Sequence, residues 1–528
     1  MPKLSPVVPK TWPIRHTVTE LPWLLGVALG LLGLWWRGHA FVPLPFLSSY
    51  DWMEYVPSAW MVTHGVDLGG YATWRNPLYP AMLGHLGEWV GYNEAAWLLG
   101  SIAMSLVVFS AGLGARAMAN PWAGLVAAVT VPFINPWAEA SRWATLYPTL
   151  AAATGMSLAC GAAFVRWRHP LWIAIASLFA GLAWGIDFRG IALVCAVLAM
   201  MLVGGKNRWG LMLGVVATIA MGQLANNAVQ IATTKDTSVA VQTQRELEVR
   251  LAVESGDMSL VRACHDEPVD SAYPTVHTLM RPCAWAFVKD NLDRATDQAP
   301  FGVGLTLLLL PLIGVGRGRG WRDRVAPILV FGAAYGAIFL MAVWARLNVH
   351  HFVQFAAPIA MTVPVAIGRL TDAMGERSAR VPVTILFAAG GLFWVTTQGP
   401  WAGKPVDDLA KAEQHQLLGW MLGGVGANVN LDGGDVLMDC TGLGVEAALL
   451  PTRTHAGPPN FQPSATSARC QQWIDHPPKT SGRVWVFTRE EPDFSGPPQP
   501  PWQMIQAFKD GPRRTWLWQL VDTNQAQP

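Results

Sequence analysis

Long continuous apolar runs recur along this chain from near residue 21 to near residue 398. Many are about 17–22 residues long, enough for an α-helix to cross roughly 30 Å of hydrocarbon. Hydrocarbon offers no partner to backbone N–H and C=O groups, so only helices and closed barrels can span it. Because the runs are continuous and do not alternate with polar residues, they predict helices. We expect about eleven spans, near residues 21–36, 95–114, 121–137, 144–165, 170–186, 190–205, 209–230, 301–316, 325–344, 349–368 and 381–398.

The composition agrees with a chain that has lipid as its main solvent. Of 528 residues, 52% are hydrophobic and only 14% are charged, with 27 tryptophans. Soluble domains carry roughly a quarter of charged residues. The net charge is +2, and no basic tract suits nucleic acid, so we expect no nucleic-acid partner. The bilayer itself is the first partner that the sequence predicts.

The basic residues give a topology, because short cytoplasmic loops collect Lys and Arg. They fall before the first span and then on every second connection, at Lys3, Lys10, Arg15, Arg116, Arg166, Arg168, Lys206, Arg208, Arg317, Arg319, Arg322, Arg324, Arg369, Arg377 and Arg380. This pattern predicts a cytoplasmic N-terminus. With an odd number of spans, everything after about residue 399 lies outside. The first span could be a signal peptide, but His39-Ala40 is a poor cleavage site and a retained anchor is favoured.

We therefore divide the chain into a transmembrane domain, 1–398, and a C-terminal domain, 399–528. The first outer loop, 37–94, has apolar residues at helical spacing and predicts one or two helices on the membrane surface. A second long outer loop covers 231–300. The C-terminal domain reads as small and α/β, with a helix at 407–422, strands at 433–440 and 482–490, and a hairpin at 504–521 around Asp510-Gly511.

Four cysteines lie in regions that the charge pattern places outside. Cys264 and Cys283 share the long loop, and Cys440 and Cys470 share the C-terminal domain. Disulfides persist in oxidising compartments. The pairings 264–283 and 440–470 are therefore expected, with four unpaired thiols as the alternative, because connectivity cannot be deduced from sequence alone.

Ionisable residues gather at the outer ends of the spans and in the first outer loop. They are Asp51, Glu54, Arg75, Glu139, Arg142, Asp187, Arg189, Arg346, His350 and His351. Charges close to a membrane are costly, and each is by default a functional hypothesis. If the spans form a bundle, these residues can converge on one cavity at the outer membrane surface.

Several of these residues have simpler explanations. Glu139 and Arg142 are three residues apart and could form a local ion pair on a helix. Asp187 and Arg189 could form a salt bridge that ends a helix. Glu54 could be a solvated residue at a helix start. The two histidines could be interfacial residues without a chemical role.

Four segments together resemble the GT-C superfamily of multi-span glycosyltransferases. They are "YDWMEYVPSAWMVTHG", "WRNPLYPAML", "ASLFAGLAWGIDFRGIAL" and "RLNVHHFVQFAAPIAM". An acidic residue shortly after the first span, followed by a helix and a turn of the form (R/K)-x-P-L-Y-P, is similar to the branch that holds protein O-mannosyltransferases and the lipid A aminoarabinose transferase. The resemblance covers the whole chain in layout and about a tenth of it in motif. Many relatives place two acidic residues side by side, whereas here Trp52 and Met53 separate Asp51 from Glu54.

The resemblance implies an α-helical polytopic membrane protein, a GT-C-like bundle of about eleven transmembrane helices with a small C-terminal α/β extracytoplasmic domain. It also implies an inverting transfer of a hexosyl or pentosyl group from a polyprenyl-phosphate donor to a lipid, glycan or protein acceptor. Asp51 would be the catalytic base, with any second acidic role falling to Glu54. Charge that holds the donor phosphate would come from Arg75, Arg189, Arg346, His350 and His351, with support from Glu139, Arg142 and Asp187.

Aromatic side chains surround the acidic stretch. Tyr50, Trp52, Tyr55 and Trp74 could offer apolar faces to a sugar ring, or they could anchor the loop at the membrane interface. A divalent metal is possible as a cofactor, since Asp51, Glu54 and either His350 or His351 would supply ligands if the fold brings them together. No tight ligand spacing such as H-E-x-x-H occurs, so the metal stays open.

Other functions remain open at this point. A transporter or flippase of lipid-linked glycans would tend to show paired repeats and polar groups at mid-membrane, and no internal repeat is found. An O-antigen ligase or polymerase would share the donor class, with its key charges in a large late outer loop such as 231–300. A non-catalytic membrane scaffold is the third alternative. Short cytoplasmic loops and a Gly- and Ala-rich chain favour a bacterial inner membrane with the active face in the periplasm.

Overall fold

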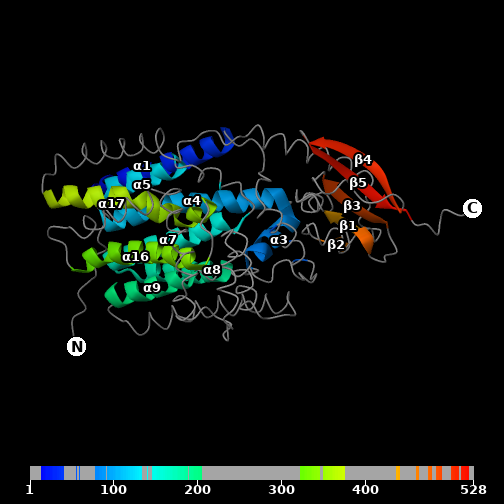
Figure 1. Cartoon of the computed structure of the whole chain (residues 1–528). Coiled ribbons are helices and arrows are strands. Elements are labelled where there is room, and N and C mark those ends of the chain that lie inside the picture. The colour runs from blue at the N-terminus through cyan, green and yellow to red at the C-terminus, as the bar shows by residue number, and fades with distance from the viewer. Residues whose placement is uncertain are drawn as a thin grey trace, which may run out of the picture.

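The structure is a computed structural model of the chain. The structure describes residues 14–40, 55, 59, 63, 78–90, 92–133, 140, 145–187, 190–204, 321–344, 349–374, 436–439, 460–462, 474–477, 483–489, 501–510 and 513–521. A bundle of helices makes up most of this part, and a β-sheet stands at one end of the bundle (Figure 1). The helical elements are α1 Ile14–Ala40, α3 Leu78–Val90, α4 Tyr92–Met118, α5 Pro121–Thr130, η1 Val131–Phe133, α7 Leu146–Trp167, α8 Pro170–Ile186, α9 Ile191–Gly204, α16 Trp321–Trp344, η3 Val349–Phe355 and α17 Ala356–Met374.

The predicted spans that fall within the described part are present as helices. α1, α4, α7, α8, α9 and α16 coincide with predicted spans to within a few residues at most ends. By length and apolar composition, three of the described helices are candidates to cross a membrane, at 95–118, 146–167 and 352–372. Five shorter apolar helices accompany them, at 20–36, 121–133, 170–186, 191–204 and 324–337. The predicted spans 209–230, 301–316 and 381–398 lie outside the described residues.

Two predicted spans differ in detail from the observed elements, and proline accounts for both differences. The span expected at 121–137 is α5 followed by the short 3₁₀ helix η1, which contains Pro132. The span expected at 349–368 begins as the 3₁₀ helix η3, and α17 starts at Ala356 with Pro358 in its first turn. Proline lacks an N–H and is tolerated best in the first turn, where that N–H has no helical partner.

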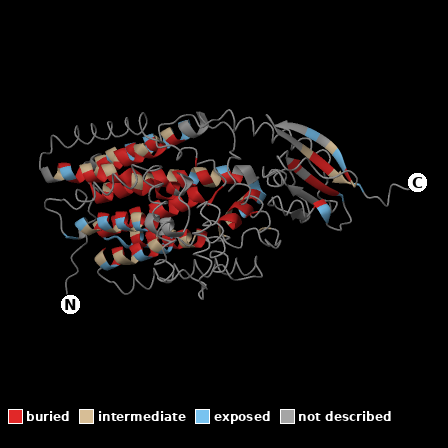
Figure 2. Cartoon of the chain, viewed as in Figure 1, coloured by how far each residue is buried: buried red, intermediate tan, exposed pale blue. Residues whose placement is uncertain are grey.

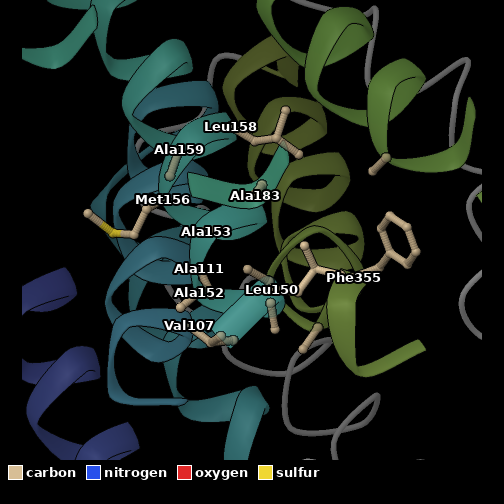
Figure 3. Packing of buried hydrophobic residues seen from close by; sticks show 14 of the residues in the cluster. Val107, Ala111, Leu150, Ala152, Ala153, Met156, Leu158, Ala159, Ala183 and Phe355 are labelled. Atoms are coloured by element: carbon tan, nitrogen blue, oxygen red, sulfur yellow. The ribbon is translucent and has the colours of Figure 1, made fainter. Parts of the chain in front are cut away.

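Helix α7 lies at the centre of the bundle. It packs against α4, α8, α9, α16, α17 and η3, and every residue from Leu146 to Val165 is buried. Figure 3 shows Leu150, Ala153 and Ala159 of α7 among side chains from α4, α8 and η3. Small residues permit this close packing, which is how helices associate where lipid removes the usual hydrophobic driving force. Buried residues fill the interior of the bundle in Figure 2, while Leu24, Leu32 and other apolar side chains of α1 stay exposed, as expected of a face turned to lipid.

An ion pair joins the start of α1 to the end of α4. Arg116 donates through Nε to Glu20 at 2.5 Å, and its second nitrogen, Nη2, donates to the other carboxylate oxygen. Trp23 Nε1 donates to the same carboxylate at 2.8 Å. The guanidinium also lies 4.8 Å from the ring centroid of Trp167, at the end of α7. This cluster, Glu20–Trp23–Arg116–Trp167, is called the staple below.

Helix α17 ends beside the staple. Arg369 is only 1% exposed, and its Nε donates at 2.9 Å to the carbonyl of Met118, the last residue of α4. A cation at a helix C-terminus is favoured by the helix dipole. Arg116, Trp167 and Arg369 thus lie at one end of the bundle, which we call the basic end. The charge pattern of the sequence predicts these connections on one side of the membrane, and the contacts of Arg116 and Arg369 bring them together.

The other end of the bundle carries α3 and faces the β-sheet, and we call it the sheet end (Figure 1). The sheet contains β1 Val436–Asp439, β2 Asn460–Gln462, β3 Val484–Arg489, β4 Trp502–Asp510 and β5 Arg513–Leu520, in the order β2-β1-β3-β5-β4. β1 pairs in parallel with β2 and β3, and β5 pairs antiparallel with β3 and β4. β1 and β3 lie within predicted strands, β4 and β5 form the predicted hairpin, and β2 was not predicted. The predicted helix 407–422 lies outside the described residues.

The two faces of the sheet have different neighbours. Trp485 and Leu517 belong to the same buried cluster as the helices of the bundle. Side chains alternate between the faces of a strand, and Val484, Val486 and Trp518 form a second cluster with Ile474. The sheet therefore has one face joined to the bundle and a small core of its own on the other.

The staple predicts a measurable coupling between α1 and α4. Arg116→Gln and Glu20→Gln should each lower the melting temperature in detergent, because each leaves a partly buried charge without its partner. The double variant should lose less than the sum of the two, by about 1–3 kcal/mol of interaction energy in a double-mutant cycle. Arg168→Gln is the matched control, since this residue is exposed at the same end of the bundle. Additive losses would show that the ion pair contributes nothing to stability.

Candidate active site at the sheet end of the bundle

The segment between α1 and α3 contributes a helical face that packs on α3. Tyr55, Ala59 and Thr63 are helical residues at intervals of four, so they share one face of a helix. The Tyr55 ring meets the Tyr79 ring of α3 edge to face, with centroids 5.2 Å apart and an interplanar angle of 89°. Aromatic pairs prefer this geometry, which adds about 0.5–1.5 kcal/mol beyond the burial of their area. The two rings are 2% and 1% exposed.

Gly84 allows the same helical face to approach α3 closely. A Cβ atom at this position would lie 2.3 Å from the carbonyl oxygen of Ala59 and 2.9 Å from Thr63 Oγ1. Thr63 Oγ1 itself donates to the Ala59 carbonyl at 2.6 Å. Only glycine fits at this crossing, so the path of the chain just after the acidic stretch is fixed by backbone contact.

Burial also decides the chemistry that Tyr79 can take part in. Desolvation raises the pKa of the Tyr79 phenol far above its ordinary value, because a buried phenolate has lost its hydration. The phenol therefore stays neutral at physiological pH and cannot act as the base of a transfer reaction. Tyr55, expected as a possible sugar contact, is 2% exposed and packs against Tyr79, so most of its surface is already covered.

The end of α8 places Asp187 at the sheet end. Asp187 is the C-cap of α8, its N–H donates to the Ala183 carbonyl, and the N–H of Gly190 donates to the Asp187 carbonyl at 2.9 Å. A Cβ at Gly190 would lie 2.2 Å from the backbone nitrogen of Trp184. The chain therefore reverses into α9 through a tight turn that needs glycine. Arg189, within this turn, lies outside the described residues.

Helix α7 also starts at the sheet end, and its first residues repeat those of α3. Leu78-Tyr79-Pro80 opens α3, and Leu146-Tyr147-Pro148 opens α7. Both tyrosines are buried. Thr145 is the N-cap of α7 but makes no side-chain capping bond. Pro148 explains part of this, because a capping hydroxyl bonds the N–H of the second or third helical residue, and proline has none.

The remaining predicted site residues divide as follows. The backbone of His350 and His351 forms part of η3, which packs against α7. The described part of the structure does not include the side chains of these two histidines. The other predicted residues that lie outside the described part are Tyr50, Asp51, Trp52, Glu54, Trp74, Arg75, Glu139, Arg142, Arg346, Cys264, Cys283, Cys440 and Cys470. Within the described residues, no group of three or more His, Cys, Asp or Glu side chains could hold a metal ion.

Several of these residues are close in sequence to described residues. Asp51 is four residues before Tyr55, and Arg75 is three before the start of α3. Ala140, fully buried, stands between Glu139 and Arg142. Sequence reasoning missed Tyr79 and Gly84. Tyr79 carried a signal, since it lies inside the quoted "RNPLYP" turn, whereas nothing in the sequence distinguishes Gly84 from other helical glycines.

Comparison with known proteins gives a fold. No protein-family profile matches the sequence, and no curated protein matches it. Among solved structures, ArnT from Cupriavidus metallidurans bound to undecaprenyl phosphate is similar at a TM-score of 0.51 and 12% identity, covering 98% of this chain and 100% of that chain. The apo state of the same protein has a TM-score of 0.50 at 12% identity and the same coverage. The Archaeoglobus fulgidus oligosaccharyltransferase in complex with Zn and sulfate is more distant, at a TM-score of 0.47 and 14% identity over 85% of this chain and 62% of that chain.

The chain therefore shares the fold of these two ArnT structures. The described part of the chain is mostly helical, and the likeness to ArnT extends over nearly the whole length of the chain.

The crossing at Gly84 predicts a specific sensitivity. Gly84→Ala should lower the melting temperature by several degrees, because the added Cβ would overlap the Ala59 carbonyl and force the two helical segments apart. Gly332→Ala is the matched control, since a Cβ at this glycine of α16 meets nothing within 4 Å. That variant should be neutral or slightly stabilising, as alanine favours a helix over glycine. Equal effects of the two substitutions would contradict the close crossing.

Proposed function

We propose that this protein is an inverting glycosyltransferase that moves a sugar from a polyprenyl-phosphate donor to an acceptor hydroxyl or amine. The site is the sheet end of the bundle, which the charge pattern assigns to the periplasmic side of a bacterial inner membrane. Three lines of support agree. They are the GT-C fold, the acidic first outer loop, and the cationic residues next to the outer ends of the spans. ArnT, which shares the fold, has been solved bound to undecaprenyl phosphate.

The observation that carries the proposal is the contact of the first outer loop with α3. Asp51 precedes Tyr55 by four residues, and Tyr55, Ala59 and Thr63 continue the same interval along one helical face. The edge-to-face contact with Tyr79 and the close crossing at Gly84 hold that face in place. We infer that this packing positions Asp51, because a catalytic carboxylate must be held by neighbours that do not themselves move. Tyr55 and Tyr79 are then positioning residues.

The chemistry needs one base and fixed positive charge. A hydroxyl is a poor nucleophile at neutral pH, so the Asp51 carboxylate takes the acceptor's proton as its oxygen or nitrogen attacks the anomeric carbon. The bond from that carbon to the phosphate oxygen breaks, and its electron pair leaves with polyprenyl phosphate. The leaving group needs no acid, since phosphate departs as an anion. Direct displacement inverts the anomeric centre, unlike the paired carboxylates of retaining enzymes.

Arginine and histidine side chains hold the departing phosphate in this proposal. Arg75, Arg189 and Arg346 carry forked donors that match phosphate oxygens, and His350 and His351 add to them. Asp187, Glu139 and Arg142 would orient these cations through ion pairs. Glu54 keeps a secondary place, because its offset from Asp51 differs from the paired acidic residues of many relatives.

The proposal also includes the domain division and topology read from the sequence. The transmembrane domain is 1–398, with outer loops 37–94 and 231–300, and the C-terminal domain is 399–528. The N-terminus is cytoplasmic and the sheet stands in the periplasm. The sheet shares the buried cluster of the bundle through Trp485 and Leu517, which supports a C-terminal domain seated directly on the membrane part.

A transfer assay tests the proposed function. Purified protein is incubated with a panel of radiolabelled polyprenyl-phosphate sugars and with candidate lipid, glycan and peptide acceptors. At least one donor should be turned over by the wild type, and Asp51→Asn should lower the rate by about 10²–10⁴-fold, the usual size of a lost general base. Asp67→Asn, in the same outer loop, is the matched control and should retain wild-type activity. The melting temperatures of both variants should match the wild type.

Two results would count against the proposal. Unchanged transfer in Asp51→Asn, with the protein still folded, would remove Asp51 from the mechanism while leaving the enzyme class intact. If no donor in the panel is turned over by the wild type, the proposed function itself fails. Reconstitution in vesicles with a lipid-linked glycan would then ask whether the protein moves its substrate across the bilayer instead.

A further inference from the structure

Five buried polar atoms in α7 and beside it have no hydrogen-bond partner within the described part of the chain. They are the hydroxyl oxygens of Thr145, Thr149, Thr154 and Ser157, and Oε1 of Gln354. Four belong to α7 or its N-cap, and the fifth belongs to η3, which packs against α7. All five residues are at least nine-tenths buried. The unpaired groups are thus concentrated around one helix.

Hydroxyls elsewhere in the described helices behave differently. Thr63, Ser105, Ser110, Thr130, Ser177, Thr362 and Thr371 each donate to a carbonyl three or four residues earlier in the chain. This local bond is the default for Ser and Thr in a helix and is open to any of them by rotation about χ1. The hydroxyls of Thr149, Thr154 and Ser157 do not make it.

Close contacts fix the level of Gln354 along α7. A Cβ at Gly155 would lie 2.9 Å from the Ala357 Cβ and 2.3 Å from Ser110 Oγ, so α4, α7 and α17 meet at this point. Gln354 precedes Ala357 by three residues, which places it about 5 Å nearer the sheet end. Thr149 and Ser157 are eight residues apart on α7, about 12 Å along the axis, and Gln354 lies within this interval.

Burying these polar groups without any hydrogen-bond partner would lower the stability of the fold. An unpaired buried hydroxyl or amide loses roughly 1–3 kcal/mol of hydration that nothing replaces. A water molecule repairs the loss, because buried water typically makes about three hydrogen bonds to groups that lack another partner. The groups here are all neutral, and hydroxyls both donate and accept, so a small neutral ligand suits them better than an ion.

We propose that bound water molecules lie beside α7 between Thr149 and Ser157 and make hydrogen bonds to the unpaired groups of Thr149, Thr154, Ser157 and Gln354. The site lies inside the bundle, within the part that the lipid hydrocarbon surrounds. Thr145 marks its outer limit at the start of α7. This inference does not depend on the transfer reaction. It means that α7, whose composition is mostly apolar, contacts water inside the bundle.

Substitutions that remove a hydroxyl while keeping the side-chain shape test the site. If water is bound, Thr154→Val and Ser157→Ala should each lower the melting temperature by about 2 °C or more, since water loses a partner and the site loses hydrogen bonds. If the hydroxyls are dry, the same substitutions remove an unpaired polar group and should raise the melting temperature. A rise in both variants would overturn the proposal.

The chain offers matched controls for both substitutions. Thr130→Val and Ser177→Ala remove hydroxyls that are already bonded to a carbonyl of their own helix, at 2.7 Å in each case. The two controls measure how far the melting temperature falls when a hydroxyl that already has a hydrogen-bond partner is removed. Thr154→Val and Ser157→Ala should lower the melting temperature at least as much. Smaller losses than in the controls would contradict bound water.

An experimental density map gives the direct check. Peaks within hydrogen-bond distance of Thr154 Oγ1 and Ser157 Oγ should be present in the wild type and absent in the double variant Thr154→Val/Ser157→Ala. A continuous lipid or glycan feature at the same place would mean that the polar groups serve a substrate instead. Such a feature would overturn the assignment to water.

Discussion

The arrangement of the bundle depends on the packing around α7. A helix buried along twenty consecutive residues, from Leu146 to Val165, must offer surfaces that several neighbours can approach at once. Its run of alanines and glycines does so. Gly155 lets α4 and α17 come within contact of its backbone, and Gly161 receives the side chain of Met200 from α9. In lipid, where burial of apolar surface gives little preference for one helix partner over another, such steric fit decides which helices meet.

The two ends of the bundle use different chemistry to terminate these helices. At the basic end, charged side chains close the structure, since Arg116 pairs with Glu20 and Arg369 satisfies a carbonyl at the end of α4. At the sheet end, the described contacts are tight backbone crossings and aromatic pairs, at Gly84, Gly190 and Tyr79. Rigid backbone contacts at that end suit a place where charged residues must be presented in a fixed arrangement. This division agrees with a catalytic site at the sheet end.

Sequence reasoning reached the helices more easily than the site. The length of an apolar run is set by the thickness of the hydrocarbon, so α8 could be predicted to the residue. The prediction of one continuous α-helix per apolar run was wrong in detail at η1 and η3, where short 3₁₀ helices next to prolines replace part of a predicted span. The short strand β2 was missed because three residues carry too little alternation to distinguish them from a loop.

The candidate site was predicted from residue types. The described structure adds the packing contacts around it, such as Tyr55 on Tyr79 and Gly84 on Ala59. Charged residues are conspicuous in an apolar chain, so Asp51 and the arginines could be singled out without coordinates. Gly84 and the unpaired hydroxyls of α7 could not, because their importance comes from contacts between segments that are distant in sequence. Tyr55 illustrates the limit of composition, since an aromatic residue beside a carboxylate suits a sugar or a neighbouring ring equally well. Its contact with Tyr79 is known only from the fold.

The staple has a consequence for how the chain is assembled during synthesis. Glu20 and Arg116 are separated by 96 residues, and Gly124 of α5 packs against the side chains of Trp23 and Arg116. Helix α1 is synthesised first, and its Glu20 carboxylate can meet the Arg116 guanidinium only after α4 has been made. Docking of α1 therefore waits for the end of α4 and the start of α5. The described neighbours of α1 are α4, α5 and η1, so its packing can be complete once the chain has been made to Phe133, whereas α4, α5 and α7 also pack against elements that follow residue 320.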